Sequence, residues 1–184
     1  MNFLRAFAPW IVYAVVPAAH WQWAALAAAL IALTELAARL RAGWPIDAVI
    51  IEIGSLIYFT GLSVVAFLDP GTPLHAYAPS FANGALALIS LTSLALRVPF
   101  TLGIAKQSTP REFWDTPLFV RTGYVLTGVW AAAFVLGCVT LALVAHAGTV
   151  ASTVTHVFTF GAPAVFTLWY AERVRARAQA LAAA

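Results

Sequence analysis

Long apolar runs are the feature that most constrains how this chain can fold. Six segments are long enough to cross about 30 Å of hydrocarbon, which takes roughly 20 apolar residues in a helix. They cover residues 3–19, 21–40, 46–68, 77–98, 118–145 and 149–171. Only 9% of the 184 residues are charged, too few to cover a soluble globule. The sequence therefore predicts an all-α, polytopic membrane protein, built as a six-helix transmembrane bundle.

The connections between these segments predict a single transmembrane domain over residues 1–184. Most of the turns are short and hold glycine or proline, as in Gly43-Trp44-Pro45. The longest connection is Pro99–Pro117, and no repeat or low-complexity linker divides the chain. The first two segments meet at His20, which predicts a tight helical hairpin. We expect the apolar stretch after Arg5 to be a retained membrane helix and not a cleaved secretory signal.

The basic residues predict the orientation. With six spans, all ten fall on one side of the membrane. They are Arg5, Arg39, Arg41, Arg97, Lys106, Arg111, Arg121, Arg173, Arg175 and Arg177. Because basic residues gather on the cytoplasmic side, both termini are predicted to be cytoplasmic, in a bacterial inner (plasma) membrane. The net charge of +3 thus reflects topology and does not predict nucleic-acid binding.

Glu52 is the acidic residue placed deepest in a predicted span. Charged groups inside a membrane normally face the bundle interior or a water-filled cavity. Glu52 lies about six residues from the cytoplasmic end of its span, and Arg97 lies near the same end of the next, so depth favours an ion pair between them. Glu35 and Arg39 form an i, i+4 pair at the inner boundary, for which a structural role is expected.

Two further polar residues lie within the predicted helices. Asn83 and His156 both fall roughly 10 Å from the outer surface, at 1.5 Å per residue, so a hydrogen bond between them is predicted. The sequence leaves two roles open for Glu52, Arg97, Asn83 and His156. They either pair inside the bundle or line a pathway for a solute, ion or proton.

The histidines lie toward the outer side. His20, His75 and His146 fall at the three outer connections, and His156 is about seven residues inside the last span. Imidazole is a common metal ligand, but this spacing matches no metal motif, so the sequence predicts neither a metal nor a cofactor. Cys138 is the one cysteine, which excludes an intramolecular disulfide.

The connection from Pro99 to Pro117 combines aromatic and charged residues. Aromatic side chains prefer the headgroup region, and basic ones are attracted to anionic lipid. The segment is therefore predicted to be an interfacial elbow that contacts lipid or a partner protein. The residues proposed for these contacts are Lys106, Arg111, Phe113, Trp114 and Asp115.

Two stretches of the sequence resemble a known family. Pro99–Gly103 opens the long connection, and Leu126–Phe134 holds Trp130 and Phe134, followed by Gly137 in a W-x3-F-x2-G-like pattern. With the order of helices and loops, they resemble the intracellular septation protein A family of bacterial inner-membrane proteins. The resemblance implies a non-enzymatic envelope protein linked to septation and envelope upkeep through protein contacts.

The motifs of soluble enzymes are absent from the sequence. It has no H-E-x-x-H, paired-cysteine motif, nucleophile elbow or glycine-rich phosphate loop, so we expect no enzyme activity. The leading hypothesis is an envelope protein that contacts the bilayer and other envelope or division membrane proteins. The alternative is a transporter or channel for a small solute, ion or proton. Small-residue faces on the helices leave a homodimer open.

Overall fold

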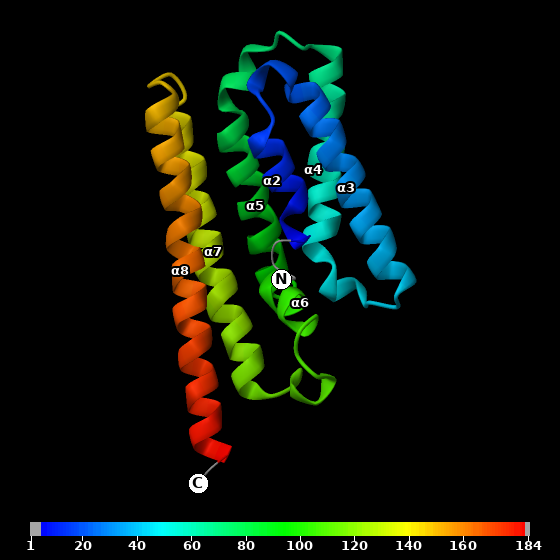
Figure 1. Ribbon diagram of the computed structural model, residues 1–184, viewed down its shortest axis with the longest axis vertical. Helices are drawn as coiled ribbons and strands as arrows, with labels where there is room; N and C mark the ends of the chain where they lie inside the picture. Colours follow the sequence, from blue (N-terminus) through cyan, green and yellow to red (C-terminus); the bar gives the residue numbers. More distant parts are fainter. Residues whose placement is uncertain (1–4, 183–184) are drawn as a thin grey trace. The chain divides into compact units, whose positions relative to one another are not determined.

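The computed structural model describes residues 5–182, in which the regular secondary structure is all helical, with no strand (Figure 1). The α-helices are α2 (Ala8–Val15), α3 (Trp21–Arg41), α4 (Ile50–Leu68), α5 (Ala78–Ala95), α6 (Phe100–Lys106), α7 (Pro117–Leu143) and α8 (Thr149–Ala182). Short 3₁₀ turns are η1 (Ala18–His20), η2 (Ile46–Ala48), η3 (Pro73–Tyr77) and η4 (Arg111–Phe113). Five helical segments are long and apolar enough to cross a membrane, which confirms the all-α, multi-span prediction in its general form.

The first predicted span is much shorter than the sequence indicated. Instead of a helix over residues 3–19, the described part of this segment has α2, eight residues long, or about 12 Å. The helix ends because Val16 is extended, with ψ 134°, before Pro17, whose ring disfavours helical geometry in the residue preceding it. A continuous sixth spanning helix is therefore not present within residues 5–182.

The chain forms two compact units, and the single transmembrane domain expected from the absence of a linker stays a prediction. The first unit contains α2, α3, α4 and residues 103–109. In Figure 1, α3 and α4 run antiparallel in contact, and α2 packs against α3. The buried face of α3 consists largely of alanines, including Ala25 and Ala28 at 0% exposure. Such small residues let neighbouring helices approach closely.

The second unit contains residues 76–102 and 110–182. Its central helix is α7, which contacts both α5 and α8 (Figure 1). Trp130 and Phe134 of α7 and Leu86 of α5 are buried at this centre. In the apolar window of α8 only 6% of residues are buried, against 39% for α7. Most of the α8 surface is thus available for lipid.

Two helices end with the same hydrogen-bond pattern. The second residue after each helix has a positive φ, and it is a glycine in one case and an arginine in the other. After α3, Gly43 has φ +76°, and the Trp44 amide donates to the Arg39 carbonyl at 3.1 Å. After α5, Arg97 has φ +60°, and the Val98 amide donates to the Ser93 carbonyl at 2.9 Å. Both ends are Schellman motifs, in which glycine is the favoured residue. Arginine carries a steric cost there that glycine does not.

We expect Arg97→Gly to raise the free energy of unfolding by about 1 kcal/mol, because it relieves this backbone strain at an exposed position. Thermal unfolding in detergent measures the change. Gly43→Ala is the matched comparison and is expected to lower stability, although a Cβ at Gly43 meets no atom within 4 Å. A fall in stability for Arg97→Gly would show that its side chain contributes more than the strain costs.

Candidate functional site

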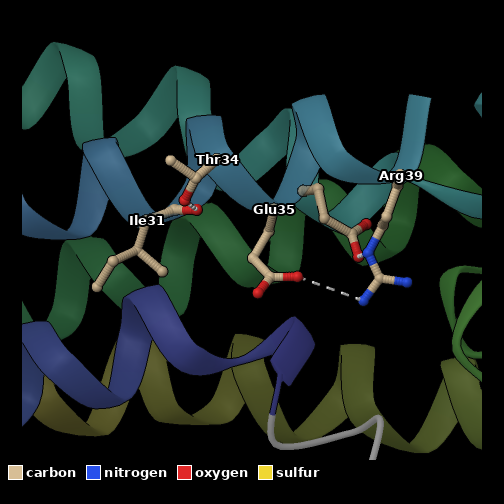
Figure 2. A network of polar contacts seen from close by, with 5 residues as sticks. Ile31, Thr34, Glu35 and Arg39 are labelled. Carbon is tan, nitrogen blue, oxygen red and sulfur yellow. Dashed lines mark hydrogen bonds and ion pairs between the residues drawn. The ribbon is translucent and has the colours of Figure 1, made fainter. Parts of the chain in front are cut away.

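Three charged side chains form a cluster in the first unit. Arg39 Nε lies 2.9 Å from Glu52 Oε1, and Arg39 Nη2 lies 4.0 Å from Glu35 Oε2. Figure 2 shows the Arg39 guanidinium turned toward the Glu35 carboxylate. The Glu52 side chain is only 2% exposed and that of Arg39 only 10%. The cluster therefore contains a buried ion pair, Arg39–Glu52, and a longer, partly exposed one, Arg39–Glu35.

The α3–α4 hairpin explains why these residues meet. Arg39 lies in the last turn of α3 and Glu52 in the first turn of α4, so the antiparallel arrangement brings them to the same depth. Depth alone had favoured Arg97 as the partner of Glu52, but the partner is Arg39. Arg97 is itself exposed and lies just after the end of α5.

A pocket of about 240 Å³ opens beside the cluster, within the first unit. It is lined by Arg5, Glu35, Ala38, Arg39, Ala42, Trp44 and Gln107. Ala42 and Trp44 follow the end of α3, whereas η1 directly precedes its first residue, Trp21. The chain from Arg5 to His20 therefore extends along the whole of α3, although only part of it is helical. The pocket was not predicted, because its lining comes from three separate stretches of sequence: Arg5, residues 35–44 and Gln107.

Aromatic side chains pack together on α4, beginning one turn after Glu52. The Trp10 indole Nε1 donates to Ser55 Oγ at 2.8 Å, and Ser55 is fully buried. The Trp10 ring stacks on Tyr58 at a centroid distance of 5.2 Å and tilts against Phe59 at 4.7 Å. The interior beyond the ion pair is thus filled by large side chains.

Asn83 lies at the α5–α7 contact in the second unit. Its Nδ2 donates to the Pro79 carbonyl at 3.0 Å, and its buried Oδ1 has no hydrogen-bond partner among residues 5–182. A Cβ added at Gly137 would lie 2.5 Å from Oδ1, so the glycine makes room for the amide. His156 instead stacks on Phe160 at 6.2 Å. The predicted Asn83–His156 hydrogen bond is wrong, because Asn83 turns toward α7 and its own helix.

Many helix hydroxyls bond to their own helix. Ser63, Ser90, Thr155, Thr159 and Thr167 each donate to the carbonyl four residues earlier, at 2.7–3.0 Å. This bonding satisfies serine and threonine in an apolar environment without a partner helix. The polar stripes of the sequence are therefore not in themselves evidence for a water-filled path.

One buried hydroxyl pair was not predicted from the sequence. Thr101 Oγ1 lies 2.8 Å from Thr127 Oγ1 and donates to the Gly123 carbonyl at 2.9 Å. The contact joins α6 to α7 within the second unit. Thr127 lies in a predicted membrane helix and Thr101 in the connection that begins at Pro99, so nothing in the sequence placed the two together.

The outer histidines have aromatic neighbours. His75 packs on Trp21 at a centroid distance of 4.8 Å, and His146 Nε2 lies 3.2 Å from the Tyr77 hydroxyl. Across residues 5–182 there is no group of three His, Cys, Asp or Glu side chains placed to hold a metal ion. Cys138 has a free thiol.

Part of the predicted contact loop lies in the second unit. Phe113 is 48% exposed, and Arg111 and Asp115 are also exposed. The Arg111 guanidinium lies 5.6 Å from the centre of the Trp114 ring, a cation–π distance. Lys106 is the last residue of α6 and belongs to the first unit. The loop thus presents an aromatic and charged surface.

Comparison with known proteins gives no relative from which a function can be transferred. No protein-family model, curated protein or solved structure matches the chain. What the chain does therefore has to be inferred from its own geometry, in which the charged cluster is the most distinctive chemical feature.

Proposed function

We propose that this chain is a non-enzymatic membrane protein that acts through contacts with other membrane proteins. The observation that carries the proposal is the burial of Glu52 against Arg39, at 2.9 Å and 2% exposure. A carboxylate that carries an ion or proton has to be reached from water, whereas this one is held by a neighbouring helix and bordered by packed aromatic rings. Its main role is then to fix α3 against α4.

The proposed topology has six crossings with both termini in the cytoplasm of a bacterial inner membrane. Arg5 lines the pocket with Ala42, beyond the last turn of α3, while His20 adjoins the first turn. This arrangement supports a first crossing made by α2, the break at Val16–Pro17 and the 3₁₀ turn η1. The charge distribution supports the same orientation, since six crossings keep all ten basic residues on one side.

Labelling of single cysteines tests this topology in intact spheroplasts. In a Cys138→Ala background, a membrane-impermeant maleimide is expected to label Gly71→Cys and to spare Ser108→Cys and Asn2→Cys. Permeabilised spheroplasts provide the control, in which the spared positions become reactive. Labelling of Asn2→Cys from outside would contradict the first crossing and leave five spans.

The proposed contact surface is the loop segment Arg111–Asp115. Phe113 is exposed, and aromatic side chains with arginine are enriched at protein interfaces. The resemblance to the intracellular septation protein A family is the basis for proposing division and envelope proteins as the partners.

Crosslinking in cells tests this surface. We expect Phe113→Ala combined with Arg111→Ala to reduce recovery of crosslinked membrane proteins by about tenfold, the change that corresponds to losing roughly 1.4 kcal/mol of binding. Phe81→Ala is the matched control, because it removes a 45% exposed phenylalanine from α5 instead. Recovery that is unchanged by the loop variants, or that is lost equally with Phe81→Ala, would refute the proposed surface.

Transport is the second candidate function, and the pocket beside Arg39 favours it. Both Glu52 carboxylate oxygens are buried without a hydrogen-bond partner among residues 5–182, although Oε1 lies 2.9 Å from Arg39 Nε. If Glu52 carries protons, proteoliposomes with a trapped pH dye show a protein-dependent flux that Glu52→Gln abolishes. The contact proposal predicts no difference between wild type and this variant.

A further inference from the structure

We propose that the pocket beside Arg39 binds the headgroup of a zwitterionic phospholipid, with phosphate on its arginines and a primary ammonium on Glu35. The pocket lies at the end of α3, where the apolar span gives way to Ala42, Gly43 and Trp44. This is the level of the lipid headgroups for a helix that crosses the bilayer, whichever way the protein is oriented. The site is therefore independent of the protein contacts proposed above.

Two arginines provide the phosphate-binding side. Arg39 uses its Nε toward Glu52, while its Nη2 is 4.0 Å from Glu35, too far for a direct hydrogen bond. Nη2 therefore makes no direct hydrogen bond to Glu35 and can donate to a phosphate oxygen in the pocket. The exposed Arg5 lines the same pocket. Guanidinium groups are suited to phosphate because their N–H donors match its oxygen geometry.

Glu35 provides the ammonium-binding side. Its side chain is 29% exposed and lines the pocket, whereas Glu52 is 2% exposed and does not. The positive charges of Arg5 and Arg39 are formally balanced by the negative charges of Glu35 and Glu52. A purely anionic ligand would be repelled by the Glu35 carboxylate on the pocket lining. A ligand that carries one charge of each sign complements the site.

The surroundings favour a lipid over a free solute. Trp44 lies on the pocket lining just beyond the α3 span, and tryptophan prefers the membrane–water interface. The volume of about 240 Å³ is below the roughly 300–1,000 Å³ of sites that enclose a drug-sized ligand. It suits a small headgroup whose acyl chains remain in the bilayer.

Binding to the purified, delipidated full chain tests the proposal by native mass spectrometry and thermal unfolding. The lipids are phosphatidylethanolamine, phosphatidylglycerol and phosphatidylcholine, with inorganic phosphate as a separate arm. Phosphatidylethanolamine is expected to bind most tightly. Arg5→Gln should weaken its binding by about tenfold, the loss of one charge-assisted hydrogen bond. Glu35→Gln should remove its advantage over phosphatidylglycerol while leaving phosphate-dependent binding.

Arg41→Gln is the matched control, because Arg41 is an exposed arginine of α3 that does not line the pocket. Thermal unfolding without lipid checks that each variant is folded, and Arg5 and Glu35 are exposed enough for this to be expected. Equal binding of the three lipids, or an equal loss with Arg41→Gln, would overturn the proposal. Inorganic phosphate bound as tightly as phosphatidylethanolamine would also overturn it, since the site would then recognise a free anion.

Discussion

Replacing Glu52 alone with leucine is expected to lower the free energy of unfolding by about 3–5 kcal/mol. The substitution leaves the Arg39 guanidinium, 10% exposed, without the carboxylate that lies 2.9 Å from its Nε. Burying a charge without its partner costs far more than the intact pair contributes. Reversible unfolding in mixed detergent micelles measures the change, and the folded fraction after extraction gives an independent reading.

The double variant Glu52→Leu with Arg39→Met supplies the decisive control for this prediction. Removing both charges should recover most of the lost stability, because apolar side chains of similar volume are tolerated where a buried pair was. Glu35→Gln should cost no more than about 0.5 kcal/mol, since its contact to Arg39 is 4.0 Å and partly exposed. Additive losses in the double variant would show that the two side chains do not depend on each other.

Gly137→Ala is expected to destabilise the second unit by about 1–3 kcal/mol through overpacking. The new methyl group would lie 2.5 Å from Asn83 Oδ1 and 3.1 Å from Thr159 Cγ2. Asn83 is fully buried, and its Nδ2 is held by the Pro79 carbonyl, so the amide has little freedom to move. Thermal unfolding in detergent measures the loss.

Gly128→Ala is the comparison on the same helix. A Cβ at Gly128 meets no atom within 4 Å, so alanine should be neutral or stabilise α7 by up to about 1 kcal/mol. Combining Gly137→Ala with Asn83→Ala should cost less than the sum of the single changes, because the clash disappears with the amide. If Gly137→Ala behaved like Gly128→Ala, close contact between α5 and α7 at this point would be wrong.

Hydropathy predicted the long helices well because a spanning helix needs a long apolar run. The predicted segments 21–40 and 118–145 correspond to Trp21–Arg41 and Pro117–Leu143. The first segment, 3–19, is equally apolar, but Pro17 limits α2 at its end. The last helix continues to Ala182, beyond the predicted end, because arginine and alanine favour helix once the chain leaves the bilayer. Hydropathy indicates which residues prefer lipid and contains little information about the residue at which a helix ends.

The sequence predicted the depth of the charged residues in the membrane but not which of them are in contact. The position of Glu52 within its span correctly marked it as a buried charge, and Arg39 and Arg97 were both available near the predicted cytoplasmic boundary. Choosing between them requires knowing which side of α4 faces α3, and a single sequence does not give this rotation. The Asn83–His156 prediction failed for the same reason. Equal depth is necessary for a contact but does not determine it.

Recovery of membrane partners by the Glu52→Leu/Arg39→Met double variant most directly tests the central claim that Glu52 is a structural ion-pair residue. Crosslinking in cells compares this variant with wild type after unfolding has shown that both are folded. We expect the double variant to recover the same partners in the same amounts as the wild type. A stable, folded double variant that has lost its partners, or lost a proton flux present in the wild type, would contradict it by showing that the charge itself performs the function.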